Sequence, residues 1–221
     1  MWKKEPPNDW LLNLNDHLPY SNHKEKTVWV DAATAAIKAM AHTHTQKFTG
    51  FYHGEFAEDA VLTYLFDYID DEHKFAVDLG AGNGFDGSNV RYLCDNYGWN
   101  SIEVDYMKGK SLKWKNTDEL KHVQNRWIKP SNVCRILEEY HPIDNLYQSD
   151  LNTFDLLSID LDSMDWYVLR ALLRGGYKPN VTILEFNPVF DYNTALVRKY
   201  SAKYKKDSTS NYGASLKAYE I

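Results

Sequence analysis

The segment that most constrains the fold is residues 75–84, where a short apolar run leads into a turn rich in glycine. Residues 75–79 read FAVDL, which has the length and composition of a buried strand. Gly80, Gly82 and Gly84 follow at alternate positions. Glycine adopts positive φ at little cost and lets the backbone approach a ligand closely. A helix that begins behind such a turn points its free N–H groups at the ligand, so the segment predicts the nucleotide-binding corner of an α/β sheet.

The spacing of these glycines indicates which class of nucleotide fits the turn. Folds that bind dinucleotides carry G-x-G-x-x-G and seat the pyrophosphate on the helix N-terminus. In this chain Phe85 occupies the position of the third glycine, and Asp78 puts a carboxylate inside the turn. A carboxylate repels a pyrophosphate and attracts a cation. The turn therefore favours a ligand other than a pyrophosphate, and an NAD-dependent oxidoreductase is the disfavoured alternative.

A second acidic segment follows the last glycine by about 20 residues, the spacing at which a carboxylate can bind the ribose hydroxyls of a nucleoside. Residues 101–105 read SIEVD, which predicts a strand that ends in acidic side chains. We favour Glu103 for the ribose role because Ile102 and Val104 share the opposite face of the strand. The alternative is an exposed acid at a strand end.

Strands and helices alternate through the rest of the chain. The predicted strands span 75–79, 101–105, a short stretch ending at 127–128, 155–162 and 181–188. The predicted helices span 31–41, 55–69, 86–96, 130–140, the stretch after residue 162 as far as 173, and the residues from about 212 onward, after a polar loop over 188–211. This alternation predicts an α/β domain with a mainly parallel, doubly wound sheet and flanking helices. We place that domain at residues 51–221, behind an N-terminal extension of residues 1–50 that contains one helix.

Acidic and amide side chains gather at the ends of the two last strands. Asp160 and Asp162 lie two residues apart and so point to one face, as do Glu185 and Asn187. Because ligands of open α/β sheets bind outside the carboxyl ends of the strands, these oxygen-bearing side chains are expected to converge. An all-oxygen cluster suits Mg²⁺ or Ca²⁺. Three alternatives stay open: Asp160 or Asp162 acts as a general base, binds an ammonium group of the ligand, or is a solvated acid.

Composition excludes several classes of function. A formal net charge of −6 and a pI near 5.7 argue against a general binder of nucleic acid or of anionic membranes. A basic, tyrosine-containing stretch over 198–206 is the one candidate nucleic-acid patch, and a solvated loop is its more ordinary explanation.

No apolar run is long enough to span a bilayer, and the N-terminus lacks the apolar core of a signal peptide. Cys94 and Cys134 show no metal-type spacing, which predicts reduced thiols and a cytoplasmic protein.

Two levels of family resemblance follow from these motifs. The string DLGAGNG at 78–84 resembles motif I of the class I S-adenosylmethionine (SAM) methyltransferases. The string FDLLSIDLDSMDW at 154–166 resembles a block of the FkbM-like methyltransferases. Further blocks resemble that group in the same order, and they are GEFAED at 54–59, GWNSIE at 98–103, KPSNV at 129–133, LEFNP at 184–188 and YGASL at 212–216.

The resemblance implies a Rossmann-like fold that transfers a methyl group from SAM to a small-molecule or sugar-like hydroxyl acceptor. The residues expected to bind SAM are Asp78, Gly80, Gly82, Asn83, Gly84 and Glu103, with Glu58 or Asp59 closing over its amino-acid tail. The residues expected on the acceptor side, as catalytic groups or as ligands of Mg²⁺, are Asp160, Asp162, Glu185 and Asn187.

The chain departs from the family pattern in two places. Ser163-Met164 replaces the usual Gly-Asn after the fourth strand. Class I methyltransferases also finish with an antiparallel hairpin, whereas this sequence stops at Ile221, so either the sequence is truncated or the sheet lacks that hairpin. The fifth strand would then be an edge with unpaired backbone groups, which a second copy of the chain could cover. A SAM-fold interaction module without catalytic activity is the alternative function.

Overall fold

A computed structural model describes residues 11–13, 58–66, 69, 73–84, 87–106, 123–140, 152–162, 164–201 and 212–220. The helix expected over 31–41 lies outside these residues, as does most of the expected N-terminal extension. Within the described part of the chain, no helix has both the length and the apolar character needed to cross a membrane.

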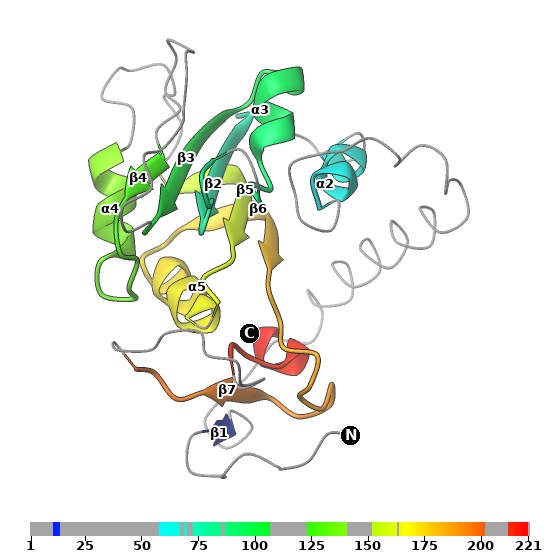
Figure 1. The fold of residues 1–221 in the computed structure, drawn as a ribbon, viewed down its shortest axis with the longest axis vertical. Helices are drawn as coiled ribbons and strands as arrows, with labels where there is room; N and C mark the ends of the chain where they lie inside the picture. The colour runs from blue at the N-terminus through cyan, green and yellow to red at the C-terminus, as the bar shows by residue number, and fades with distance from the viewer. Residues whose placement is uncertain are drawn as a thin grey trace.

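The centre of the structure is a parallel sheet of five strands (Figure 1). In chain order they are β2 (Phe75–Leu79), β3 (Asn100–Asp105), β4 (Val123–Asn125), β5 (Thr153–Ile159) and β6 (Lys178–Leu184). Their order across the sheet is β4-β3-β2-β5-β6, and each neighbouring pair is parallel. The expected α/β class with a parallel sheet is confirmed. The chain moves from β2 toward one edge through β3 and β4, and then crosses to the other side of β2 for β5 and β6.

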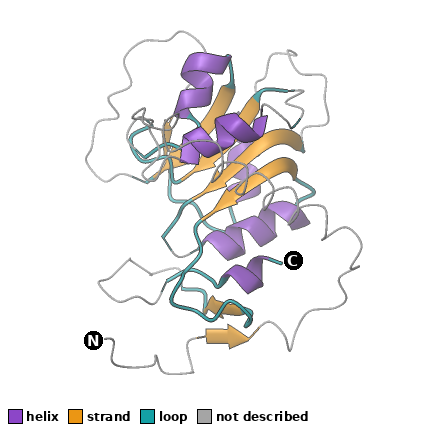
Figure 2. Cartoon of the chain, turned by 90° about the vertical axis from the view of Figure 1, so that its right-hand side faces the viewer, coloured by secondary structure: helices purple, strands orange, loops and turns teal. Residues whose placement is uncertain are grey.

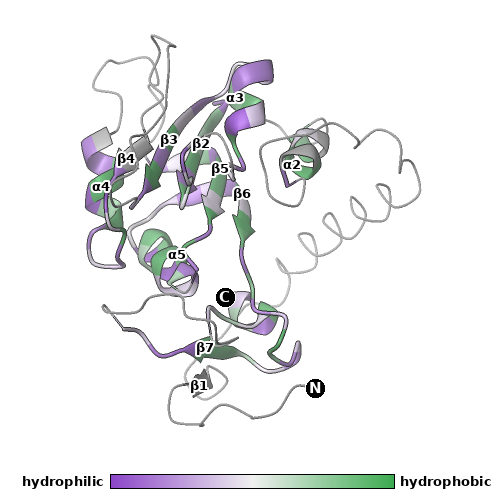
Figure 3. Ribbon diagram, viewed as in Figure 1, coloured by the Kyte–Doolittle hydropathy of each residue, from purple (hydrophilic) through white to green (hydrophobic). Residues whose placement is uncertain are grey.

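Helices cover both faces of the sheet (Figure 2). Helices α2 (Glu58–Phe66) and α3 (Arg91–Tyr97) lie on one face, where Leu62 and Leu93 pack with Ala76 of β2. Helices α4 (Val133–Tyr140) and α5 (Asp165–Arg174) lie on the other, where they pack against Val77 and its neighbours. Hydrophobic segments run along the strands and the helices that cover them (Figure 3). Neighbouring residues of β2, such as Ala76 and Val77, thus serve two separate cores.

Several element boundaries differ from the sequence expectation. The third strand was expected to end at 127–128, but β4 ends at Asn125, and Trp127 and Ile128 lie beyond it. Helix α3 begins at Arg91 rather than near 86, because the residues just before it bind side chains of the sheet. Strands β5 and β6 end at Ile159 and Leu184, earlier than expected. The acids predicted within these strands therefore lie just past their carboxyl ends.

A small antiparallel pair lies apart from the main sheet. Strand β1 (Leu11–Asn13) pairs with β7 (Leu196–Arg198), which occupies part of the stretch expected to be a loop. The helix expected from about 212 is a single 3₁₀ turn, η2 (Leu216–Tyr219). The indole N–H of Trp166 on α5 donates to the carbonyl oxygen of Ala218 at 2.9 Å, which fastens this turn to the α/β core. Non-local contacts, rather than local propensity, shape this end of the chain.

Candidate functional site

The glycine turn lies where the direction of chain progression reverses, between β3 and β5. Gly80, Gly82 and Gly84 all have positive φ, at 102°, 59° and 75°. The N–H of Gly80 donates to the carbonyl oxygen of Val104 on β3 at 2.8 Å. On its other side, a Cβ atom built on Gly80 would lie 1.8 Å from the carbonyl oxygen of Asp160 after β5. The turn is thus wedged between both neighbouring strands, and its first position accepts only glycine.

Asp105, the last residue of β3, is the acid that contacts the turn. Its Oδ2 atom accepts the N–H of Gly82 at 2.7 Å, and its side chain is half-buried. Burial raises the pKa of Asp105, and the negative charge of Asp162 adds to that rise. Asp105 is the end of the strand predicted over 101–105, but it is not among the site residues predicted from the sequence. The position of Asp105 at the very end of the strand is the sequence feature that could have indicated its place in the site.

Glu103, the residue preferred for the ribose, is completely buried. Its Oε1 atom accepts the hydroxyl of Ser101 at 2.8 Å, on the face covered by α3. The face predicted for Glu103 is confirmed, since Ile102 and Val104 pack in the opposite core. Strand alternation does not predict how deep a side chain lies, because Glu103 and Asp105 share a face and only Asp105 stands at the strand end. Asp105, not Glu103, is partly exposed at the turn.

Asp78 is also enclosed, with a side chain that is 2 % exposed. Its carboxylate accepts hydrogen bonds from the hydroxyls of Ser88 and Ser158 and from the backbone N–H of Asn89. The side-chain amide of Asn89 donates in turn to the Ser158 hydroxyl at 3.0 Å. Burial raises the pKa of Asp78 to about 6, and the three hydrogen bonds oppose that rise. This carboxylate holds the segment after the turn against the sheet.

The other residues expected to bind the cofactor lie in the glycine turn and at the start of α2. Asn83 is half-buried within the turn, and Gly84 closes the turn by donating its N–H to Ala81 at 2.8 Å. Glu58 is the half-buried first residue of α2, on the same side of the sheet as α3. The side chain of Asp59 lies outside the described residues. A role for either acid at the amino-acid tail of a ligand stays a prediction.

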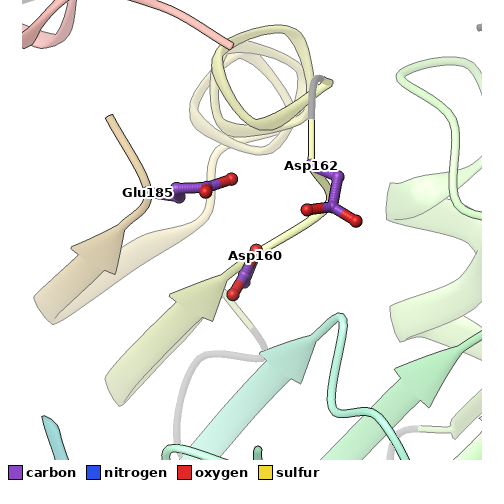
Figure 4. Close-up of side chains that lie close together, drawn as sticks. All are labelled: Asp160, Asp162 and Glu185. Carbon is purple, nitrogen blue, oxygen red and sulfur yellow. The ribbon is translucent and has the colours of Figure 1, made fainter. Parts of the chain in front are cut away.

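Three acids converge beyond β5 and β6, as the sequence predicted (Figure 4). Asp160, Asp162 and Glu185 each offer a carboxylate oxygen, and these oxygens lie within 4.8 Å of one another. Asp160 is exposed and the other two are half-buried. Asp162 has a φ of 58°, a left-handed conformation that is uncommon for a residue other than glycine. The cluster has the oxygen donors that a hard divalent cation uses, and it equally supplies a carboxylate that could accept a proton.

Asn187, the fourth residue of the predicted cluster, serves the loop that follows β6. Its side-chain amide donates to the carbonyl oxygen of Tyr212 at 2.9 Å, and its Oδ1 atom accepts the N–H of Val189 at 3.0 Å. The side chain is almost fully buried. Because both ends of this amide bind the backbone, Asn187 serves the loop and not the acidic cluster.

An exposed aromatic pair borders the site on the side of β4, and it is not among the residues predicted from the sequence. Tyr106 directly follows Asp105, and Trp127 follows β4. Their ring centroids are 4.8 Å apart in an edge-to-face arrangement, and the two residues are 46 % and 41 % exposed. Large aromatic side chains that remain exposed at the carboxyl edge of a sheet are available for a ligand. In the sequence, the feature that could have indicated this pair is Tyr106 directly after the acid at the strand end.

Comparison of the chain with known proteins finds no match. No family model, no curated protein and no solved structure matches the chain.

Proposed function

We propose that this chain is a Rossmann-like, SAM-dependent methyltransferase. The observation that carries the proposal is the glycine turn at the reversal point of the sheet, with Asp105 accepting the N–H of Gly82. In open α/β sheets this is the place where nucleotides bind, and an acid at the end of the neighbouring strand suits the ribose hydroxyls. Asp105 takes the ribose role in the proposal, in place of Glu103, because it is half-buried at the turn whereas Glu103 is enclosed.

The charge of the site favours a cationic nucleoside over a dinucleotide. The carboxyl ends of three strands carry acids, which are Asp105, Asp162 and Glu185. The negative charge of Asp162 acts on Asp105 and contributes to its raised pKa. A pyrophosphate brought to this edge would meet these carboxylates, whereas a sulfonium and an ammonium group would be attracted to them. SAM carries both of these cations together with a ribose and an adenine base. The acidic edge therefore supports SAM as the ligand and argues against NAD.

The aromatic pair gives the base a surface to stack on. A ribose held at Asp105 puts its base within reach of Tyr106, the next residue, and of Trp127 beside it. Stacking on an aromatic side chain contributes about 1–3 kcal/mol per base. We propose that the adenine of SAM contacts this pair.

The acidic cluster is the proposed acceptor side. In methyl transfer the hydroxyl oxygen of the acceptor attacks the sulfonium methyl, the carbon–sulfur bond breaks, and S-adenosylhomocysteine leaves. The hydroxyl proton passes to a carboxylate, for which Asp160 and Asp162 are the candidates. Alternatively these acids and Glu185 hold Mg²⁺, which would acidify the hydroxyl. Since SAM is already a reactive donor, either arrangement needs mainly to align the acceptor oxygen with the methyl carbon.

Ligand-dependent thermal unfolding of the full chain tests the proposal. We expect SAM and S-adenosylhomocysteine to raise the melting temperature and NAD to leave it unchanged. A ligand at about 100 times its Kd adds about 2.7 kcal/mol, or on the order of 5–10 °C for a chain of this size. Repeating each measurement with and without Mg²⁺ separates a metal effect from a cofactor effect. If neither SAM nor its product shifts the transition, the chain does not bind this cofactor and the interaction-module alternative gains support.

A further inference from the structure

The basic stretch that is predicted as a candidate nucleic-acid patch, residues 198–206, begins against helix α5 (Figure 1). The hydroxyl of Tyr167 on α5 donates to the carbonyl oxygen of Arg198 at 2.8 Å. The ring of Tyr200 packs edge-to-face on that of Tyr167, with the ring centroids 5.4 Å apart. Residues 198–200 are therefore held to the helix by both contacts, which the alternative of a solvated loop does not explain.

Cationic side chains accompany the two tyrosines. Arg170 and Arg174 share the face of α5 that carries Tyr167, because residues three and four apart in a helix are neighbours on its surface. The guanidinium of Arg170 lies over the ring of Trp166, 5.1 Å from its centroid, which fixes the position of this cation. Lys199 and Arg174 are exposed. We call the following residues the basic–aromatic surface: Tyr167, Arg170, Arg174, Lys199 and Tyr200.

Acids do not balance the charge of the two segments that form this surface. Helix α5 and residues 196–201 carry one acid, Asp165, and its side chain is fully buried. Within the part of the chain that the structure describes, no ion pair engages Arg170, Arg174 or Lys199. The whole chain has a formal net charge of −6, so the basic–aromatic surface is opposite in sign to the protein as a whole. Such a local concentration of positive charge attracts an anionic partner.

We propose that the basic–aromatic surface binds single-stranded nucleic acid. Its cations attract the phosphates, and its exposed tyrosine offers a ring on which a base stacks. Tyr200 is 43 % exposed and Tyr167 holds its ring, so little side-chain freedom is lost when a base binds. Cations alone would serve an anionic membrane, and the pair of fixed tyrosines is what favours nucleic acid. This binding is separate from that of the ligand at the glycine turn.

Fluorescence anisotropy with labelled oligonucleotides tests the proposal on the full chain in the absence of SAM. The probes are oligothymidylate and oligouridylate of about ten nucleotides, which compare DNA with RNA, and an abasic strand of the same length, which keeps the phosphates without the bases. We expect at least one of the first two to bind about 5- to 150-fold more tightly than the abasic strand, the factor that stacking of one base contributes. Contacts of Arg170, Arg174 and Lys199 with phosphates should also make the affinity fall about 20-fold between about 50 and 200 mM salt.

Variants separate the contact with the base from the effect of charge. Tyr200→Ala should weaken binding of the oligonucleotide about 5- to 150-fold and leave binding of the abasic strand unchanged, whereas Tyr200→Phe keeps the ring and should retain the wild-type affinity. Arg174→Glu combined with Lys199→Glu should weaken binding of every probe by more than about tenfold. The control combines Arg135→Glu with Lys178→Glu, two exposed residues outside the surface, and makes the same change in net charge. It should weaken binding by less than about threefold, because salt screens distant charges.

Several results would each overturn the proposal. One is the absence of binding at about 100 µM protein and about 50 mM salt, since nonspecific nucleic-acid binding has a Kd of about 10⁻⁴–10⁻⁶ M. Equal affinity for the abasic strand and the oligonucleotides, or unchanged affinity in Tyr200→Ala, would leave a simple polyanion surface. A loss in the control as large as that in Arg174→Glu with Lys199→Glu would show that net charge governs binding.

Vesicles that contain phosphatidylserine test the membrane alternative. Binding to these vesicles without binding to oligonucleotides would assign the surface to a membrane and overturn the proposal. Because SAM is absent from every measurement, failure of the methyltransferase proposal would leave this test intact.

Discussion

The carbonyl oxygen of Asp160 lies 1.8 Å from the position that a Cβ atom would take on Gly80, so the glycine turn and the strand that leads to the acidic cluster touch at this point. The N–H of Asp160 donates to the carbonyl oxygen of Leu79 at 2.9 Å, which fixes the approach. The proposed cofactor side and the proposed acceptor side thus share one backbone contact. A change at Gly80 must displace β5, the turn, or both.

A pair of glycine substitutions measures that contact. Gly98 also has positive φ, at 72°, but a Cβ atom there would meet nothing within 4 Å. Gly98→Ala should therefore cost only the backbone strain, about 1–2 kcal/mol of unfolding free energy. Gly80→Ala adds a clash with backbone and should cost more than about 3 kcal/mol. Urea unfolding of the two variants gives the comparison, and equal costs would show that β5 yields freely to the added methyl group.

Asp105→Ala tests the acid at the turn. The substitution removes the partner of the Gly82 N–H and the group proposed to bind the ribose. Loss of a hydrogen bond to a charged group costs about 1.5–3 kcal/mol, so the Kd for SAM should rise by about 10- to 150-fold. Titration calorimetry provides the measurement, with the exposed Asp95→Ala as the matched control. Unchanged affinity in Asp105→Ala would return the ribose role to Glu103.

The raised pKa of Asp78 predicts how the stability of the whole protein depends on pH. Its folded pKa of about 6 exceeds the ordinary value of 3.8 because of burial, so the folded state binds a proton that the unfolded state releases in this range. Its contribution to stability is present below pH 3.8 and is lost as the pH rises through 6. The wild type should gain about 1.4 kcal/mol between pH 7.5 and pH 5 relative to Asp78→Asn, which is about 3–5 °C in Tm. Calorimetry at both pH values checks the difference, and parallel curves for the two proteins would refute it.

Asp162→Asn tests whether the acidic cluster holds a cation. Asparagine tolerates the left-handed φ of 58° at this position, so the variant removes charge with little change in backbone strain. If Mg²⁺ binds, millimolar Mg²⁺ should raise the Tm of the wild type by several degrees, and that rise should shrink to about zero in Asp162→Asn. Glu139→Gln on α4, which is exposed, is the control and should keep the wild-type response. If Mg²⁺ does not change the Tm of the wild type, only the proton-accepting role remains for Asp160 and Asp162.

Asp155→Ala tests a contribution to the stability of the fold and not to ligand binding. This buried carboxylate accepts the backbone N–H groups of His73 and Phe75 and the side-chain amide of Asn180, and so it joins the start of β2 to β5 and β6. Asp155→Ala leaves these donors unpaired and should lower the unfolding free energy by about 3 kcal/mol. Chemical denaturation measures the loss. Because the residue lies at the end of the sheet opposite the glycine turn, any ligand affinity should persist below the unfolding transition.

The sequence was informative where the structure depends on local pattern. Residues 75–79 form the expected strand with the expected bounds, and α5 ends at Arg174, one residue beyond the predicted end at 173. The convergence of Asp160, Asp162 and Glu185 was also predictable, since parallel strands place their carboxyl ends at one edge. The β1–β7 pair was not, because these short segments are far apart in sequence and each becomes a strand only through the other.

The sequence by itself determined the parallel sheet, the glycine turn and the edge at which acids gather, because periodicity and glycine positions act within a few neighbouring residues. Tertiary structure alone decided which acids remain accessible there. Asp78 is closed in by the segment that leads into α3, Glu103 is fully buried on the face that α3 covers, and the backbone of a distant loop engages Asn187. Asp105 stays at the turn. Strand alternation fixes the face of a side chain, but its depth depends on which non-local element covers that face.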